Sequence, residues 1–118
     1  LQELNAIIHP KVKQHFINWL KQYEDFSFVV KEVAILFETG GDASCDKIIL
    51  VTAPEEVRIK RVMQRDKTER INVKNRIKNQ LSDKEKKAKS DFVIENIDMN
   101  NTMKQVDKVL KILNENGL

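Results

Sequence analysis

The sequence contains a single cysteine, Cys45, in 118 residues. One thiol cannot form a disulfide within the chain, so the cross-linked frameworks of small secreted domains are excluded and a reducing, cytoplasmic location is expected. The immediate neighbours of Cys45 are Ser44 and Asp46, neither of which favours the thiolate. A structural or incidental thiol is therefore favoured over a nucleophile.

Long apolar runs and aromatic residues are also scarce. No stretch is long enough to span a bilayer and no signal-peptide pattern opens the chain, so we expect no membrane association. Aromatic residues make up only 6% of the chain, and residues 38–91 contain none. Because proteins that bind single-stranded nucleic acid usually stack bases on aromatic side chains, this absence argues against nucleic acid as a partner.

Positive charge is concentrated in one segment. Residues 55–89 carry 13 Lys and Arg against 6 Asp and Glu, a net charge of +7, whereas the remainder carries 8 against 12. The overall charge of +3 thus conceals a basic segment that suits a local polyanion. With 41% apolar residues, a chain of this length suits one compact domain.

A predicted strand followed by a predicted helix is the most informative stretch. Lys47–Ala53 is mostly apolar, contains β-branched residues and ends at a proline, which predicts a buried strand. Pro54 suits the first position of a helix, and the acidic residues after it suit the first turn. Ile59, Val62 and Met63 share one face at helical spacing and predict its buried side.

Three arginines lie on a neighbouring face of this predicted helix. Arg58, Arg61 and Arg65 present planar guanidinium donors that match the oxygens of a phosphate group. A solvated basic face is the alternative, and it is commoner for an arbitrary helix. This helix leaves the carboxyl end of a predicted strand, where ligands bind in α/β folds, which favours a phosphate site.

Apolar periodicity predicts further elements on both sides. Before this strand, one helix ends at His9, another begins at Pro10, and the run Phe26–Val33 predicts an interior parallel strand. After the arginine helix we expect a thin basic helix with Val73, Ile77 and Leu81 on one side, a short helix capped by Ser82, a strand at Asp91–Glu95 and a helix at Thr102–Asn116. The basic helices have little apolar surface to hold them, as is typical of a mobile lid.

Glu38 is the candidate catalytic carboxylate. It is predicted to lie at the carboxyl end of a strand, just before Gly40 and Gly41, where the backbone can bend sharply. There it could order a magnesium-bound water or hold a substrate hydroxyl, or it could cap backbone amides at a helix start; the sequence leaves both open. His9 and His15 have no partners at metal-binding spacing, so no metal site is predicted.

Several ordered motifs resemble the dephospho-coenzyme A kinase family. Asp46–Val51, Ala53–Glu55 and Arg61–Asp66 are similar to the second half of these enzymes. The other matching segments are Leu4–Pro10, Glu32–Glu38 with Ala34 in place of the usual proline, Gln80 and Asp91–Asn96. The resemblance spans nearly the whole chain. The family's Gly-rich phosphate-binding loop, which ends in Gly-Lys-Ser or Gly-Lys-Thr, would lie upstream of all of these segments.

The resemblance implies an α/β fold: a P-loop kinase-like three-layer fold with a parallel sheet whose first strands are missing, plus helical acceptor-binding and lid segments. The expected parts are a helical coenzyme A-binding segment at 1–25, core strands with the arginine helix at 26–66, lid helices at 67–90, and a final strand and helix at 91–118.

The resemblance also implies an activity, the ATP-dependent phosphorylation of the ribose 3′-hydroxyl of dephospho-coenzyme A, with magnesium held by the missing loop region. Arg61 matches the lid arginine that binds ATP phosphates, with Arg65 and Arg58 beside it, and Asn96 matches the asparagine that contacts adenine. Arg61 and Glu38 are the catalytic candidates. His9 is the candidate for contact with coenzyme A.

Without the phosphate-binding loop, the chain is expected to hold half an active site. The alternatives are therefore an inactive structural or regulatory fragment of this fold, or a basic nucleic-acid-binding module. The strands Phe26–Val33 and Lys47–Ala53 would flank the family's loop-bearing strand, so without it their facing edges are unpaired. A homo-oligomer or a strand-swapped assembly is a further expectation.

Overall fold

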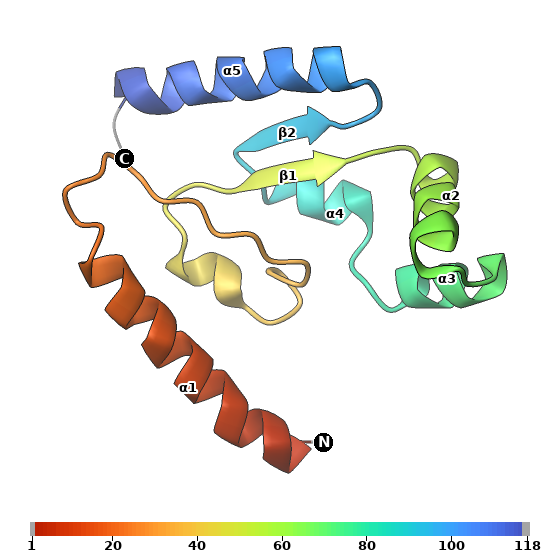
Figure 1. Cartoon of the computed structure of the whole chain (residues 1–118), viewed down its shortest axis with the longest axis horizontal. Coiled ribbons are helices and arrows are strands. Elements are labelled where there is room, and N and C mark those ends of the chain that lie inside the picture. The colour runs from red at the N-terminus through yellow and green to blue at the C-terminus, as the bar shows by residue number, and fades with distance from the viewer. Residues whose placement is uncertain (1, 117–118) are drawn as a thin grey trace. The chain divides into compact units, whose positions relative to one another are not determined.

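The computed structural model describes the backbone of residues 2–116 and the side chains of residues 10–115 (Figure 1). Residues up to 32 form one compact unit and residues 33–116 form another. The elements, in chain order, are α1 (Gln2–Lys21), a 3-10 helix (Gly41–Ser44), β1 (Ile49–Thr52), α2 (Glu55–Asp66), α3 (Arg70–Lys78), α4 (Asp83–Ala88), β2 (Phe92–Glu95) and α5 (Met99–Asn116). None of the described helices is both long and apolar enough to cross a membrane.

The first unit is built on α1, which runs through Pro10 without a break. The predicted helix boundary at Pro10 is therefore wrong, because helical bonds on both sides carry the backbone past the one donor that proline lacks. Aromatic rings follow one another along the helix and the turn after it. Ring centroids lie 5.9 Å apart for Phe16 and Trp19, 4.7 Å for Trp19 and Tyr23, and 5.6 Å for Tyr23 and Phe26.

No strand forms at Phe26–Val33, so that prediction is also wrong. Residues 28–33 have no regular structure, and they pair with no strand among the described residues. Their β-branched composition favours an extended backbone, but a strand also needs a neighbour to accept its amides and donate to its carbonyls. Composition alone therefore could not decide this element.

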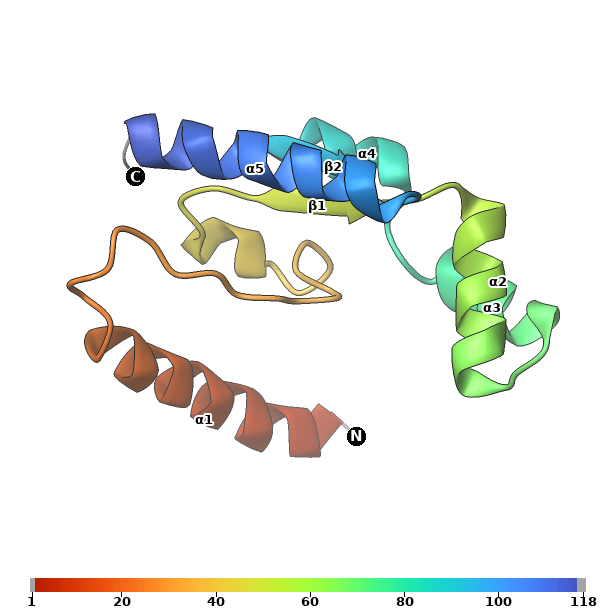
Figure 2. The ribbon, with the colours of Figure 1, turned by 45° about the horizontal axis from the view of Figure 1, so that its top comes forward.

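The second unit contains a two-stranded parallel sheet, as predicted for the segments at 47–53 and 91–95. The register pairs Leu50 with Val93 and Thr52 with Glu95. Asp91 fixes the start of the pairing, since its Oδ2 accepts from the Ile48 backbone N at 2.8 Å. The connection from β1 to β2 runs through α2, α3 and α4, and it brings the carboxyl ends of the two strands side by side (Figures 1 and 2).

Helix α5 packs on β2 and also closes its outer edge. Ile94, Val109 and Leu113 are buried in this contact. The Gln105 side chain acts like one residue of a neighbouring strand: its Oε1 accepts from the Glu95 backbone N at 2.9 Å, and its Nε2 donates to the Glu95 backbone O at 2.9 Å. α5 begins at Met99, three residues before the predicted start, because the Asp98 carbonyl already accepts from the Thr102 backbone N.

Helices α2 and α3 pack against each other as a pair. Ile59 of α2 is 0% exposed and Val73 of α3 is 2% exposed, so one apolar residue from each helix is almost fully buried. α2 begins at Glu55, directly after Pro54, and ends at Asp66; the next residue, Lys67, has a left-handed backbone (φ 51°) that turns the chain toward α3. α4 begins as predicted: the Ser82 Oγ accepts from the Glu85 backbone N at 3.2 Å.

Candidate functional site

The carboxyl ends of β1 and β2 form the corner at which the candidate site is built. The Asn96 backbone N, just after β2, donates to the Thr52 backbone O at 2.7 Å. α2 leaves this same corner, and Arg61 reaches back to it. Its Nη1 donates to the Asn96 backbone O at 2.7 Å and its Nη2 to the Ile97 backbone O at 3.4 Å. Arg61 and Asn96, both predicted to bind ATP and 35 positions apart in the sequence, thus lie in direct contact.

The side chain of Asn96 is oriented by α5. Its Oδ1 accepts from the Thr102 Oγ1 at 2.9 Å, which fixes which end of the amide faces the helix. Within the described chain, no residue accepts from the Asn96 Nδ2. The amide nitrogen is therefore the group that can donate to a ligand at this corner.

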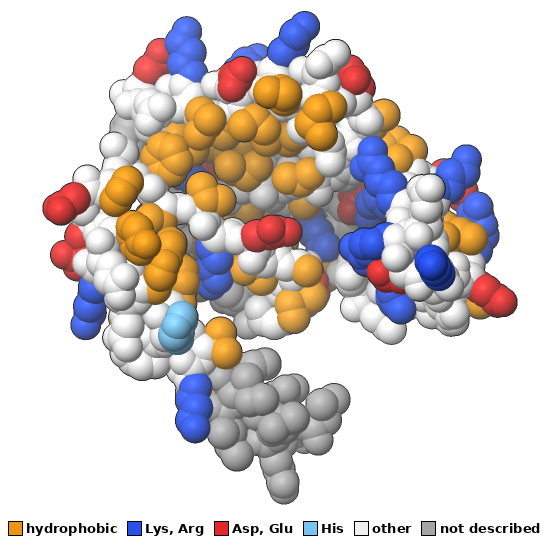
Figure 3. Space-filling view, in the orientation of Figure 1, with side chains coloured by type: hydrophobic (Ala, Val, Ile, Leu, Met, Phe, Trp, Pro, Cys, Tyr) orange, Lys and Arg blue, Asp and Glu red, His pale blue; other side chains and the backbone are white. Residues whose placement is uncertain are grey.

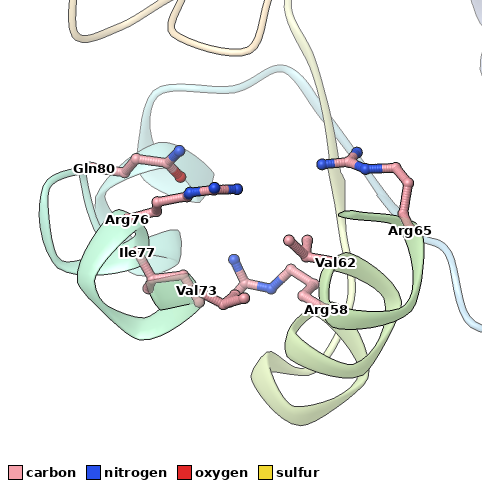
Figure 4. A pocket seen from close by; sticks show the side chains of 7 residues that line it. All are labelled: Arg58, Val62, Arg65, Val73, Arg76, Ile77 and Gln80. Atoms are coloured by element: carbon pink, nitrogen blue, oxygen red, sulfur yellow. The ribbon is translucent and has the colours of Figure 1, made fainter. Parts of the chain in front are cut away.

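Arg58 and Arg65 lie elsewhere. They line a pocket between α2 and α3, here called the α2–α3 pocket (Figure 4). Seven residues apart on a helix, they differ in direction by only about 20°, whereas Arg61 is turned by about 60° from Arg58. The predicted single arginine face is thus divided between two places. The pocket is lined by Arg58, Val62, Arg65, Val73, Arg76, Ile77 and Gln80.

Carboxylates hold the arginines of this pocket. The Arg58 Nη2 donates to the Asp83 Oδ2 at 2.8 Å, and the Thr52 Oγ1 donates to the same oxygen at 3.4 Å. Asp66 accepts from Arg65 at 2.8 and 3.0 Å and from the Arg76 Nη1 at 3.2 Å. The two hydrogen bonds from Arg65, and then the one from Arg76, hold the pKa of the Asp66 carboxyl below its usual range.

Glu38 lies in a turn at residues 34–40, and the prediction that it ends a strand is wrong. The turn closes through the Thr39 N–Ile35 O and Gly40 N–Phe37 O hydrogen bonds, and Gly40 takes the left-handed backbone expected there (φ 75°). The Glu38 Oε1 lies 3.8 Å from the Lys86 Nζ of α4, and these side chains are only 20% and 13% exposed.

The carboxylate of Glu38 is therefore already paired with an ammonium group, and it is not free to bind magnesium in this arrangement. Among the described residues, no group of three or more His, Cys, Asp or Glu could hold a metal ion. The side chain of His9 lies outside the described residues, so the predicted contact with coenzyme A stays a prediction.

Sequence reasoning assigned no role to several residues that shape the site. Asp66 and Asp83 hold the pocket arginines, and Arg76 and Gln80 line the pocket. The carboxylate next to Arg65 and the acidic first turn of α4 were visible in the sequence. The arginines with which these carboxylates pair could not be predicted, because each pairing depends on how α2, α3 and α4 pack.

The chain matches known proteins over most of its length. Residues 1–103 match the family model described as Dephospho-CoA kinase. A protein of Fusobacterium nucleatum named dephospho-CoA kinase is 44% identical over 96 residues, which are 81% of this chain and 49% of that protein. A dephospho-CoA kinase of Bacteroides fragilis is 40% identical over 94 residues, 80% of this chain and 46% of that protein.

A solved structure agrees with the fold. The crystal structure of TT1252 from Thermus thermophilus matches with a TM-score of 0.88 at 30% identity, covering 94% of this chain and 58% of that one. The predicted fold class, α/β of the P-loop kinase type with a parallel sheet, is thereby confirmed. The chain spans about half the length of the curated relatives it matches.

Proposed function

This chain belongs to the dephospho-CoA kinase family, and on that premise we propose that the protein transfers the terminal phosphoryl group of ATP to the ribose 3′-hydroxyl of dephospho-coenzyme A. The products are ADP and coenzyme A. Phosphoryl transfer of this kind depends on positioning and on positive charge around the transferring group more than on covalent partners. A basic segment with oriented arginines suits that requirement.

The observation that supports this proposal is the contact between Arg61 and Asn96. Arg61 uses two of its guanidinium nitrogens to hold the backbone after β2, and its remaining donors are available to phosphate oxygens. Asn96, oriented by Thr102, offers its amide nitrogen to the edge of adenine. In our proposal one corner of the sheet therefore aligns the base and the phosphates of a single nucleotide.

The other predicted residues take supporting roles in the proposal. Arg58 and Arg65 line the α2–α3 pocket and not the Arg61–Asn96 corner, and in the proposal they keep their predicted contribution to ATP binding as further positive charge on the same helix. For Glu38 to act on a substrate hydroxyl or a magnesium-bound water, its carboxylate must first leave Lys86. The described residues offer no magnesium site, so we assign the metal that supports this chemistry to none of them. We expect the reaction to take place in the cytoplasm, where a lone thiol stays reduced.

The 118 residues by themselves are proposed to be inactive, because no Gly-x-x-x-x-Gly-Lys-Ser or -Thr motif occurs among them. The nucleic-acid alternative receives no support from the geometry. Four arginines of the basic segment are engaged by carboxylates, and those are Arg58, Arg65, Arg70 and Arg76. Positive charge that is already paired attracts a polyanion less strongly than the sequence count suggests.

The test is the substitution Arg61→Ala in the full-length gene product, assayed for coenzyme A formation from ATP and dephospho-coenzyme A. Loss of a phosphate-binding arginine is expected to lower kcat by roughly two to four orders of magnitude at saturating ATP. Lys60→Ala is the matched control, since it removes one positive charge from an exposed position of the same helix. Near-normal turnover in Arg61→Ala, or an equal loss in both variants, would contradict the role of Arg61.

A further inference from the structure

The last residue of β2 is held by a side chain of α5. The Gln105 Oε1 accepts from the Glu95 backbone N at 2.9 Å, and the Gln105 Nε2 donates to the Glu95 backbone O at 2.9 Å. The same Nε2 also donates to the Asn101 backbone O at 3.4 Å, one turn earlier on the helix. One side chain, itself tied to its own helix, therefore binds both backbone groups of Glu95.

Glu95 immediately precedes Asn96, whose amide is proposed to face adenine. These two residues are held by different elements. The Asn96 backbone N donates to the Thr52 backbone O of β1 at 2.7 Å, whereas the Glu95 backbone N donates to Gln105 of α5. Because the end of β2 is fixed by a strand and by a helix, the position of Asn96 depends on Gln105 as well as on β1.

Helix α5 also sets the orientation of the Asn96 side chain. Thr102, one turn before Gln105, donates its hydroxyl to the Asn96 Oδ1 at 2.9 Å. The helix is anchored on β2 by Val109 and Leu113, each only 8% exposed. One anchored helix thus fixes where Asn96 lies, through Gln105, and which end of its amide is free, through Thr102.

The position of this amide matters for which base the corner can bind. A fixed donor distinguishes adenine, whose ring nitrogen N1 accepts a hydrogen bond, from guanine, whose N1 carries a hydrogen and cannot accept. Hydrogen bonds weaken steeply as their geometry departs from the ideal, so a small shift of the Asn96 amide removes part of this preference. Selection of adenine therefore requires Asn96 to be held in place, and not only to be present.

We propose that Gln105 is a positioning residue for base selection. By holding both backbone groups of Glu95, it keeps Asn96 where its amide binds adenine in preference to guanine, and it touches no ligand itself. The inference rests on the proposed function only in taking the ligand of the Arg61–Asn96 corner to be an adenine nucleotide. The alternative is that Gln105 does no more than satisfy the edge of β2, which stabilises the fold without affecting the choice of base.

The experiment measures the affinities of the full-length gene product for ATP, by calorimetric titration, and for GTP, by competition with ATP, without any acceptor. Gln105→Met keeps the length of the side chain and removes both hydrogen bonds to Glu95. We expect it to weaken the binding of ATP by about fivefold, the typical value of one hydrogen bond, and that of GTP much less. Gln105→Glu keeps an oxygen for the Glu95 backbone N and loses the donor, so its loss should be intermediate.

Val109→Ala is the matched control for stability. It weakens the packing of α5 on β2, but an apolar side chain forms no hydrogen bond to the backbone of Glu95. This variant should lower the Tm and leave the preference for ATP over GTP unchanged. The proposal would be overturned by unchanged ATP affinity in Gln105→Met, by equal weakening of ATP and GTP, or by the same loss of preference in Val109→Ala. Should Gln105→Met not fold, Gln105→Glu provides the same comparison.

The outcome is separable from that of the proposed function. Since only binding is measured, the role of Gln105 can be confirmed even if coenzyme A formation is not observed. Conversely, turnover by the unsubstituted protein, together with an unchanged preference for ATP in Gln105→Met, would leave the proposed function standing and remove the role of Gln105.

Discussion

Three polar groups of Asn96 have separate partners: its backbone N binds Thr52, its backbone O accepts from Arg61, and its Oδ1 accepts from Thr102. The first two contacts do not depend on the side chain. A substitution at this position therefore tests the amide alone. What changes is the end of the side chain that is proposed to face adenine.

We predict that Asn96→Asp raises KM for ATP by about tenfold, because the hydrogen bond proposed from the amide nitrogen to the edge of adenine is lost. KM for dephospho-coenzyme A should change little. The aspartate keeps an oxygen for Thr102, so the start of α5 should be preserved. Steady-state kinetics of the full-length gene product with each substrate varied in turn measures this.

Thr102→Val is the control for orientation, because it removes the hydroxyl that fixes the Asn96 amide and leaves the amide itself in place. We expect a smaller rise in KM for ATP than in Asn96→Asp. An effect of Asn96→Asp confined to dephospho-coenzyme A would mean that this corner faces the acceptor.

Helix α2 carries one fully buried side chain. Ile59 is the one large side chain of the described residues that is fully buried. An isolated helix of this length is only marginally stable in water, so α2 depends on burying this side chain against the rest of the fold.

We predict that Ile59→Ala lowers the free energy of unfolding of the full-length gene product by about 2–5 kcal/mol, the cost of a cavity at a buried aliphatic residue. Ile71→Ala is the matched control, because Ile71 of α3 is 58% exposed and should change the stability by less than about 1 kcal/mol. Denaturant titration of both variants makes the comparison. Equal losses would indicate that the burial of Ile59 is not what stabilises this part of the fold.

Asp66 links the two helices through charge. Its pKa is depressed by Arg65 and then by Arg76, so its ionised form stabilises the folded state. That stabilisation is fully present above the pKa of an unfolded aspartate, about 3.9, and is lost as pH falls through the lower folded value.

We therefore predict that Asp66→Asn lowers the Tm of the full-length gene product at pH 7, and that the difference from the unsubstituted protein shrinks as pH falls below about 4. Thermal unfolding across this range measures it. The control is Asp107→Asn, which removes a carboxylate from an exposed position of α5 and should leave no such pH-dependent gap. A gap that persists unchanged at low pH would contradict the ionic origin.

Elements whose signal is local were predictable from the sequence. Ser82 caps α4, both strands of the parallel pair lie where they were expected, and α2 begins after Pro54. The segment Phe26–Val33 was not predictable, because a strand depends on a partner far away in the sequence. The divided arginine face was partly visible in the helical spacing of Arg58, Arg61 and Arg65. The contact between Arg61 and the backbone after β2 was not predictable, because it depends on how the connection from β1 to β2 folds back.

At the scale of the second unit, the two edges of the sheet differ. Gln105 of α5 closes the outer edge of β2, whereas no described strand pairs with the other edge of β1. Apolar side chains gather between α5 and the strands (Figure 3), and Val51 of β1 is 58% exposed. An edge strand with unpaired amides beside an apolar surface is a template for pairing with another chain.

We predict that the 118-residue chain, prepared by itself, is not a stable monomer but associates through the free edge of β1. Size-exclusion chromatography with light scattering over a range of concentrations measures its mass. Val51→Lys should reduce the association, because a charge on an edge strand opposes pairing with a second strand. Ile97→Lys is the control, since Ile97 is 49% exposed but follows β2 rather than lying in a strand. A monomer with cooperative unfolding would contradict the prediction. An equal effect of the two substitutions would show that general apolar contact, and not the strand edge, drives the association.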